Sequence, residues 1–487
     1  MIRFVLIIAF FLVNNSFAFA QSKIETAINA LTKDAALAHA SVSVCVMDVA
    51  TGKVLNDFQP NVSLTPASSM KVMTTAAALA LLGPDYQFKT TLEYDGELTA
   101  DGTLNGNLYI KGYGDPTLAS PIFEAADNME VVLRKFKKAI DEAGIKKITG
   151  RIVGDDSWLG TAGSGKTWAY EDLGNYYGAG ALGLNFHENL YFLSLRQKPT
   201  LGATPPIEKV EPKIPNLLLM NELTSAAKGS GDNAFIFGAP YNYTCFVRGT
   251  IPIGSKSFTI KGAIPDPVFT AAAILMNYLE ENGVETSKRA TSFMEMKLEG
   301  WDNKKRATIY THRSPSLKAI VAHTNMKSVN LYCEGMLRVM GKEKGEGGTP
   351  EAGLKVLHDF WKKKGLKTEG LFLEDGSGLS PYNALSSYHL AEVMRLIKKD
   401  ENLFNAFYDS LPIAGQSGAL RYRLKGTKAA GNLRAKSGGL NRVRSYTGLA
   451  KNAAGQWVSF AMIVNNYKGT SKTTLIRLEQ LMKSICE

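Results

Sequence analysis

The chain has 487 residues, of which 45% are hydrophobic and 21% charged, and its formal net charge is +11. That length suggests about three domains with a large core, and the composition is that of a globular protein without low-complexity tracts. The basic excess could attract anionic cell-wall polymer or a membrane surface, or could be incidental. No basic-aromatic cluster argues for nucleic acid.

The N-terminal residues have the pattern of a secretory signal peptide. Arg3 supplies a positive charge, residues 4–13 form an apolar run, and Ala18 and Ala20 frame a small-x-small cleavage site. An uncleaved membrane anchor is the alternative, but the run is shorter than the about 20 apolar residues that span a bilayer. We therefore expect a signal peptide at residues 1–20, and a mature protein exported to the periplasm or cell-wall space.

Residues 41–55 predict a β-hairpin, and residues 68–82 predict a buried helix that stops at Gly83. The first turn of this helix carries Ser68 and Lys71, which lie three positions apart and therefore on one face. A serine at this position is ordinarily only an N-cap. The lysine is unusual, because burial and the positive end of a helix both disfavour its charged form. A neutral lysine can take a serine proton, so the pair predicts a nucleophile.

The chain beyond about residue 91 changes to strand and turn signals, with DG and NG hairpin pairs. Helical sequence interrupts the strands at residues 129–144 and returns at residues 266–283. We expect an inserted region that ends near residue 306.

Residues 160–167 read GTAGSGKT and match the phosphate-binding pattern GxxxxGK[ST]. A working phosphate loop follows an apolar strand and opens a helix. Here Asp155 and Asp156 stand in the preceding segment, and the following residues 174–183 hold four glycines, too many for a helix. We therefore expect a surface loop that binds no nucleotide.

Two later motifs join Ser68 and Lys71 in a known order. Ser328 and Asn330 frame an SxN triplet before an apolar-periodic helix, and Lys436 opens the triplet KSG before a predicted strand at residues 457–464. Each motif is weak alone, but SxxK, SxN and K[ST]G in this order form a strong joint signal. The sequence contains neither HExxH nor GxSxG, so a zinc hydrolase or a Ser-His-Asp hydrolase has little support.

With these motifs the chain resembles the penicillin-recognising serine enzymes. It is most similar to the low-molecular-mass class C penicillin-binding proteins, the D-alanyl-D-alanine carboxypeptidase/endopeptidase family. The blocks GYGDPTLAS, YGAGALGLNFHENL, DGSGLSPYN and SLPIAGQSGALRYRLKGT also look like family blocks, so the resemblance covers nearly the whole mature chain. Ser437 stands where the family usually has threonine, and Val329 fills the variable centre of SxN.

The resemblance implies an α/β (α+β) fold: a beta-lactamase/transpeptidase-like catalytic domain with a large, mainly β inserted region. We expect the catalytic domain at residues 21–91 and 307–487, and the inserted region, as two nested domains, at residues 92–306. The final residues 473–487 have apolar side chains at helical spacing. We expect a helix packed on the sheet there, although a peripheral membrane-surface anchor is an alternative.

The implied function is an exported serine D-alanyl-D-alanine carboxypeptidase and/or endopeptidase, which acts on peptidoglycan stem peptides through a Ser68 acyl-enzyme and is inhibited by beta-lactams. No cofactor or metal is expected, and the oligomeric state is left open. A beta-lactamase or esterase of the same superfamily and a non-catalytic cell-wall-binding protein are the alternatives. The implied catalytic residues are Ser68, Lys71, Ser328, Asn330 and Lys436, and the implied substrate-binding residues are Ser437, Gly438, Gly439 and Asp155.

Asp155 is the boldest of these assignments. Acids at a strand end are usually just solvated, but family members use an acid from an inserted domain to meet the amine of the stem peptide's third residue. Asp155 is the candidate here, with Trp158 as a wall of the pocket. The cysteines Cys45, Cys245, Cys333 and Cys486 lie far apart without a CxxC pair, so they predict neither a disulfide framework nor a metal site, although one bridge is possible.

Overall fold

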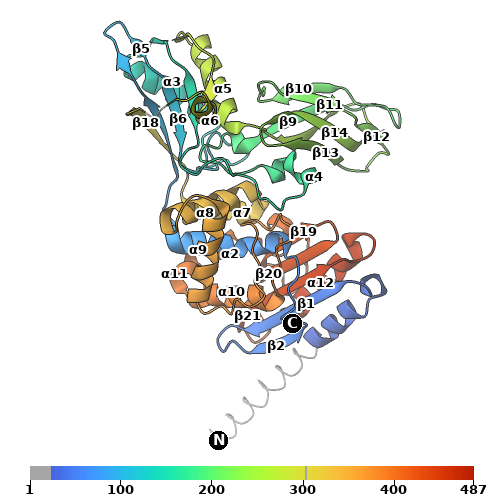
Figure 1. Ribbon diagram of the computed structural model, residues 1–487. Coiled ribbons are helices and arrows are strands. Elements are labelled where there is room, and N and C mark those ends of the chain that lie inside the picture. The colour runs from blue at the N-terminus through green and yellow to red at the C-terminus, as the bar shows by residue number, and fades with distance from the viewer. Residues whose placement is uncertain (1–22, 302–303) are drawn as a thin grey trace, which may run out of the picture. The chain divides into compact units, whose positions relative to one another are not determined.

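The computed structural model describes residues 23–301 and 304–487 (Figure 1). The predicted signal peptide therefore lies outside the described residues. The chain divides into two compact units: the first joins the chain up to Asp85 to Leu317–Val329 and Leu354–Glu487, and the second joins Tyr86–Ser316 to Asn330–Gly353. The catalytic and inserted domains expected at residues 21–91, 92–306 and 307–487 stay predictions.

An antiparallel sheet with strand order β19-β20-β21-β1-β2 forms the centre of the first unit. The expected hairpin at residues 41–55 is present as its last two strands, and the expected strand at residues 457–464 is β21. The strands are β1 (Ser41–Asp48), β2 (Val54–Phe58), β19 (Arg434–Leu440), β20 (Val443–Lys451) and β21 (Trp457–Asn465).

Helices cover both faces of this sheet. Alternate residues of β1 point to opposite faces: Val44 lies in an apolar core with Leu478 of α12, whereas the hydroxyl of Ser43 donates to that of Ser387 in α10 at 2.7 Å. The helices of this unit include one over the described residues 23–32, α2 (Lys71–Leu82), α7 (Leu317–Lys327), α9 (Pro350–Lys363, which begins in the second unit), α10 (Ser387–Lys399), α11 (Glu401–Phe407) and α12 (Ser471–Ile485).

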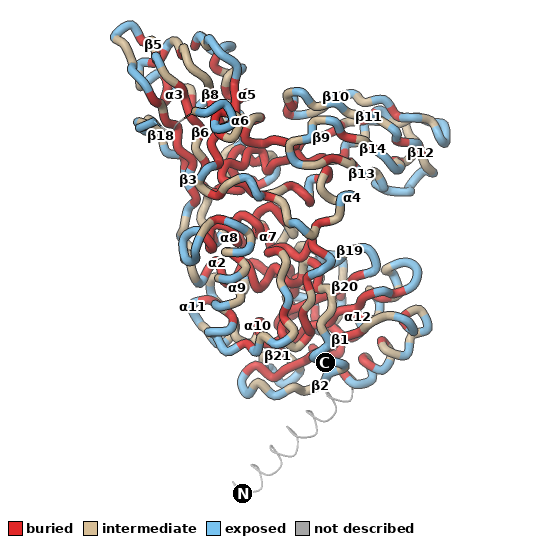
Figure 2. Tube along the Cα trace, viewed as in Figure 1, coloured by how far each residue is buried: buried red, intermediate tan, exposed pale blue. Residues whose placement is uncertain are grey.

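The second unit contains two large, separate apolar cores, visible as buried stretches in Figure 2, and a smaller cluster of Tyr109, Val153, Phe293 and Met296. One core lies between the sheet β17-β8-β6-β3-β18 and the helices α3 and α5. The other core is all-β, between β10-β9-β15 and the sheet of β11, β12, β13 and β14. Its residues, from Tyr191 to Ile264, fall between the two sequence segments that build the first core.

Capping side chains explain where the two predicted helices of this unit begin. Asn128 accepts from the Val131 amide at 3.0 Å at the start of α3, and Asp266 accepts from the Phe269 amide at 2.9 Å at the start of α5. The helices of the second unit are α3 (Met129–Glu142), α4 (Tyr170–Leu173), α5 (Pro267–Glu281), α6 (Phe293–Leu298) and α8 (Asn330–Lys344).

The strands of the second unit are mostly short. They are β3 (Lys89–Tyr94), β4 (Glu97–Leu98), β5 (Thr103–Asn105), β6 (Leu108–Gly112), β7 (Lys147–Ile148), β8 (Ile152–Asp155), β9 (Leu190–Arg196), β10 (Ile207–Glu211), β11 (Leu218–Asn221), β12 (Thr224–Ala226), β13 (Asn233–Ala239), β14 (Asn242–Pro252), β15 (Ser257–Ala263), β16 (Glu285–Thr286), β17 (Thr291–Ser292) and β18 (Ala307–Arg313).

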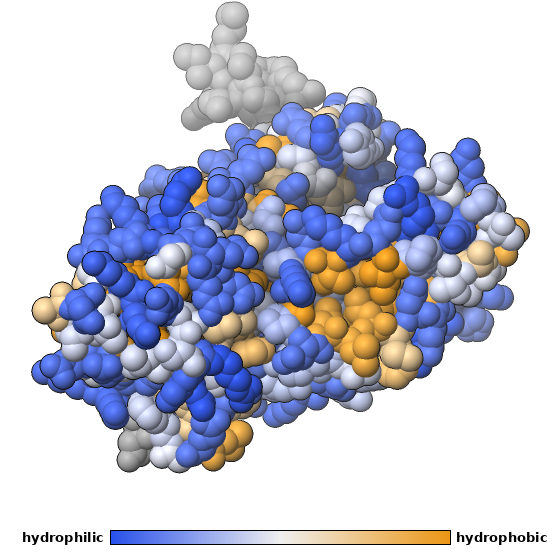
Figure 3. Space-filling view, turned by 90° about the horizontal axis from the view of Figure 1, so that it is seen from above, coloured by the Kyte–Doolittle hydropathy of each residue, from blue (hydrophilic) through white to orange (hydrophobic). Residues whose placement is uncertain are grey.

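Hydrophilic residues cover most of the face shown in Figure 3, and apolar residues gather in places. Exposed apolar side chains of the second unit include Leu218 and Met220 on β11 and Phe235 on β13. Within the described part of the chain, no helix combines the length and the apolar character needed to cross a bilayer.

The C-terminal helix α12 packs on the sheet, which confirms that expectation. Leu478 is fully buried in the core, whereas Ile476 on the same helix is 47% exposed.

We expect Leu478→Ala to lower the free energy of unfolding by about 2–5 kcal/mol, because it leaves a cavity. Ile476→Ala is the matched control and should change stability little. Denaturant titration of both variants measures this, and equal small effects would contradict the docking of α12.

Candidate active site

Ser68 lies in a 3-10 turn, Ala67–Met70, that leads directly into α2. The Nζ of Lys71 donates to Ser68 Oγ at 2.8 Å and to the carbonyl oxygen of Ser377 at 2.6 Å. The Lys71 side chain is fully buried, and the structure shows no side-chain capping bond at the start of the turn or of α2. Ser68 is therefore held by the lysine and does not act as a helix cap.

Ala67, which precedes Ser68, has a φ of 48° in the left-handed region. Non-glycine residues rarely adopt this conformation, and where they do the surrounding structure has to impose it. A strained residue next to a nucleophile is a recurrent way to set the direction of its side chain. The serine hydroxyl here is placed by backbone geometry as well as by Lys71.

The loop at residues 375–383, the block DGSGLSPYN, supplies the second acceptor for Lys71. The carboxylate of Asp375 accepts from the amides of Gly378 at 2.7 Å and Ser380 at 2.6 Å. Thr74 of α2 also donates to the carbonyl of Gly376 at 2.7 Å. The contact between the carbonyl of Ser377 in this block and Lys71 could not be predicted, because a backbone acceptor leaves no signal in residue types.

Lys436 and Ser328 form a second pair in the first unit. Lys436 Nζ donates to Ser328 Oγ at 2.9 Å and to the carbonyl of its neighbour Ser437 at 2.8 Å, and the lysine is 1% exposed. Ser328 has a φ of 63°, and its amide donates to Thr324 at 2.7 Å. The fold thus brings together two motif residues that are 108 positions apart.

Strand β19 passes close to the turn that carries Ser68, and Gly438 permits this approach. A Cβ on Gly438 would lie 2.5 Å from the carbonyl oxygen of Pro66 and 2.8 Å from the amide nitrogen of Ser69. Glycine is therefore required for backbone packing, a reason that sequence analysis did not find. Gly439, the next residue, is exposed.

Asn330 opens helix α8 and belongs to the second unit. Its side-chain amide donates to the carbonyl of Tyr177 at 2.8 Å, and the residue is 8% exposed. The structure thus forms the pairs Ser68–Lys71 and Ser328–Lys436 within the first unit and places Asn330 within the second.

Comparison with known proteins identifies the family. The sequence model of the D-Ala-D-Ala carboxypeptidase 3 (S13) family matches residues 24–483. The chain belongs to this family. It is 28% identical over 455 residues to a D-alanyl-D-alanine carboxypeptidase of an Actinomadura species, a match that covers 91% of this chain and 81% of the relative. It is 24% identical over 458 residues to the D-alanyl-D-alanine carboxypeptidase DacB of Haemophilus influenzae, with 90% of each chain covered.

The fold is also similar to solved structures. The crystal structure of penicillin binding protein 4 from Haemophilus influenzae has a TM-score of 0.80 at 24% identity, covering 94% of this chain and 97% of that one. This likeness confirms the predicted transpeptidase-like fold with additional β-rich regions. The protein is a D-Ala-D-Ala carboxypeptidase of the penicillin-binding family and hence a serine peptidase.

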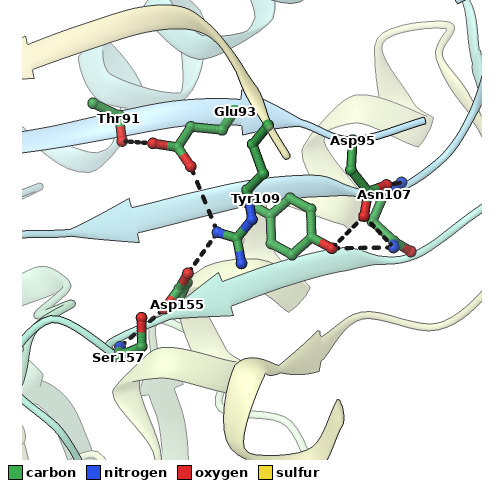
Figure 4. A network of polar contacts seen from close by, with 8 residues as sticks. Thr91, Glu93, Asp95, Asn107, Tyr109, Asp155 and Ser157 are labelled. Carbon is green, nitrogen blue, oxygen red and sulfur yellow. Dashed lines mark hydrogen bonds and ion pairs between the residues drawn. The ribbon is translucent and has the colours of Figure 1, made fainter. Parts of the chain in front are cut away.

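Asp155 of the carboxypeptidase does not face solvent. It ends β8 fully buried, where its carboxylate pairs with Arg306 Nη1 at 2.5 Å and accepts from the Ser157 amide at 2.9 Å (Figure 4). The guanidinium of Arg306 also lies 3.6 Å from the centroid of the Tyr109 ring and 3.5 Å from Glu93 Oε2. This geometry does not fit the expected contact with a substrate amine, because the carboxylate oxygens are already occupied by a buried cation and an amide.

Replacing Asp155 by Asn should therefore act on stability. Breaking a buried ion pair costs up to about 3–5 kcal/mol, and the contact that Arg306 keeps with Glu93 is longer, at 3.5 Å, so the thermal midpoint should fall markedly. Asp141→Asn, which removes an exposed pair with Lys137, is the control and should cost less than about 1 kcal/mol. A loss of kcat/KM confined to peptides whose third residue carries a free amine, at unchanged stability, would instead support the substrate role expected from the sequence.

The neighbouring carboxyl group, Asp156, is 4% exposed. Burial raises its pKa to about 6, with further contributions from the nearby carboxylates Asp155 and Asp266. A carboxyl whose pKa is higher in the folded than in the unfolded state binds more protons when folded, so stability falls as pH rises between the two values. Charged Asp156 is thus a destabilising group at neutral pH.

Asp156→Asn should remove this pH-dependent cost. Because the pKa rises from 3.8 to about 6, the variant should gain up to about 3 kcal/mol over wild type above pH 7 and almost nothing below pH 4. Thermal unfolding of both proteins across this range measures the difference. A stability difference that does not change with pH would show that Asp156 titrates normally.

The GTAGSGKT segment is a loop, as predicted, because no helix begins until α4, which has four residues. The preceding strand β8 is buried, however, including Asp155 at its end, and Asp156 after it is also buried, contrary to the expectation that acids at a strand end are solvated. The guanidinium of the buried Arg338 donates to the carbonyls of Leu159 at 2.5 Å and Gly160 at 3.0 Å. A phosphate loop presents amide N–H groups to an anion, whereas here carbonyls face a cation.

The cysteines Cys45, Cys245, Cys333 and Cys486 are buried, and no disulfide joins any two of them. Among residues 23–301 and 304–487, no group of three or more His, Cys, Asp or Glu side chains is arranged to hold a metal ion.

Proposed function

We propose that the protein is an exported serine carboxypeptidase that removes the terminal D-alanine of peptidoglycan stem peptides through an acyl-enzyme on Ser68. The contact of Lys71 Nζ with Ser68 Oγ at 2.8 Å, with the lysine fully buried, is the observation that carries the proposal. In its neutral form such an amine accepts the hydroxyl proton as the oxygen attacks a carbonyl carbon.

Acyl transfer at this serine proceeds in two steps. In the first, the bond from Ser68 Oγ to the carbonyl carbon of the penultimate D-alanine forms, and the bond from that carbon to the nitrogen of the terminal D-alanine breaks. The serine proton passes to Lys71 and from there, relayed through the Ser328 hydroxyl that Lys436 contacts at 2.9 Å, to the leaving amine, so that Lys71 is neutral again. In the second step a water molecule attacks the ester carbon and gives a proton to Lys71, which passes it to Ser68 Oγ as the ester bond breaks.

Substrate binding is assigned to the remaining motif residues. The ammonium group of Lys436 and the hydroxyl of Ser437 would bind the terminal carboxylate of the substrate. The side chain of Asn330 would hydrogen-bond the peptide backbone of the substrate. The amides of Ser68 and Gly439 are proposed to stabilise the oxyanion. Beta-lactams would acylate the same serine as substrate mimics, which accords with the membership of the penicillin-binding family.

Cleavage of peptide cross-links is a further part of the proposal, because both reactions cleave after a D-alanine. The pattern of residues 1–20 supports export to the compartment where peptidoglycan lies. Mass analysis of the products from muropeptide monomers and cross-linked dimers distinguishes carboxypeptidase from endopeptidase activity.

Ser68→Ala should abolish covalent labelling by fluorescent penicillin, because it removes the attacking oxygen. The thermal midpoint should fall only modestly, since Ser68 makes no capping bond and Lys71 keeps the carbonyl oxygen of Ser377 as an acceptor. Ser69→Ala is a matched control: this neighbouring serine is buried and donates to the carbonyl of Pro66 at 2.8 Å, so its loss should leave labelling in place. Undiminished labelling of Ser68→Ala would show that the nucleophile is elsewhere.

A further inference from the structure

A left-handed turn of non-glycine residues lies in the second unit at His187–Asn189. The φ angles of His187, Glu188 and Asn189 are 56°, 54° and 51°. In this region the Cβ of an L-residue crowds the following carbonyl oxygen, so consecutive residues rarely adopt it. Such strain persists where the surroundings impose it, and it concentrates at functional sites.

Hydrogen bonds from the flanking chain hold this turn. The amide of Phe186 donates to Asn189 Oδ1 at 2.9 Å, and Asn189 Nδ2 donates to the carbonyl of Gly180 at 2.8 Å. The amide of His187 donates to the carbonyl of Leu118 at 2.9 Å. The turn is therefore fixed on both sides, and Glu188 at its centre is 3% exposed.

The carboxylate of Glu188 accepts hydrogen bonds from two hydroxyl groups. One comes from Ser120, and the other comes from Tyr332, whose hydroxyl oxygen lies 2.7 Å from Glu188 Oε1. Ser120 and Tyr332 are both buried. A buried hydroxyl that lost this acceptor would bear a desolvation cost, so the bond to Tyr332 constrains where the tyrosine lies.

Tyr332 is in the first turn of α8, two residues after Asn330. The same turn is tied to the chain near Tyr177, whose carbonyl accepts from the Asn330 amide at 2.8 Å. Asn330 is thus fixed at the end of a helix whose own first turn is fixed by Glu188. Glu188, Tyr332, Asn330 and Tyr177 all belong to the second unit.

We propose that Glu188 is a positioning residue: its carboxylate holds Tyr332 and so sets the position of Asn330 for the reaction. The strained turn drives the carboxylate into the interior, where it serves as the acceptor that the first turn of α8 requires. This inference rests on the proposed function, because it gives Glu188 a part only in a reaction that uses Asn330.

Two tyrosines provide a matched test. Tyr332 and Tyr109 are both fully buried in the second unit, and each donates to a buried carboxylate at 2.7 Å, that of Glu188 and that of Asp95 (Figure 4). Tyr109 lies on β6, away from α8 in the sequence. Tyr332→Phe and Tyr109→Phe therefore each remove a hydroxyl bond to a buried carboxylate, and Tyr109→Phe also removes a longer bond from Asn107 at 3.2 Å. Only Tyr332 is linked to Asn330.

The rate constant for acylation by fluorescent penicillin and the thermal midpoint are measured for both variants. Tyr332→Phe should lower the second-order acylation constant roughly tenfold, the lower end of the effect of a hydrogen bond to a charged group. Both substitutions should lower the thermal midpoint by similar amounts. Tyr109→Phe should leave the acylation constant within about twofold of wild type. Equal acylation rates for the two variants would overturn the proposal.

A double-mutant cycle separates positioning from general stability. If Glu188 acts through Asn330, Glu188→Gln should slow acylation in the wild-type background and add almost nothing in an Asn330→Ala background. Fully additive losses would contradict the proposal, and Tyr332→Phe replaces Glu188→Gln in the cycle if the glutamine variant fails to fold. Persistent labelling of Ser68→Ala would overturn the proposed function, whereas normal labelling at Ser68 with an unaffected Tyr332→Phe would overturn only the role of Glu188.

Discussion

Burial of the Lys71 amine is the constraint on which the first unit depends. A buried amine must find its acceptors inside the protein, because water cannot supply them. Ser68 provides one acceptor and the carbonyl of Ser377 another, and the second is in place because the loop folds around Asp375. The contacts that keep the lysine satisfied are thus the same contacts that hold the serine hydroxyl beside it.

Features that depend on local pattern could be predicted from the sequence. The helix after Ser68, the hairpin at residues 41–55 and the helix α12 follow from apolar spacing and stop residues, and Ser68 and Lys71 meet because they share one turn. The contact between Lys436 and Ser328 spans 108 positions, so only resemblance to a family indicated it. No local rule connects segments that far apart.

Buried polar groups could not be predicted, because their environment comes from distant residues. Asp155 reads as a solvated strand end, yet it is buried against Arg306, which lies 151 positions later. The left-handed turn around Glu188 could not be predicted either. Such turns are usually indicated by glycine, and residues 187–189 contain none. In both places a buried carboxylate is stabilised by a specific partner that lies far away in the sequence.

The division of the chain has a consequence for how this protein can be altered. The backbone passes between the two units after Asp85, after Ser316, after Val329 and after Gly353. Excision of residues 86–316 would therefore not yield a minimal enzyme, because residues 330–353 would lose contacts such as those with Tyr177, Glu188 and Leu159. The second unit consists of two separate sequence segments, so a truncation or a domain exchange has to include both of them.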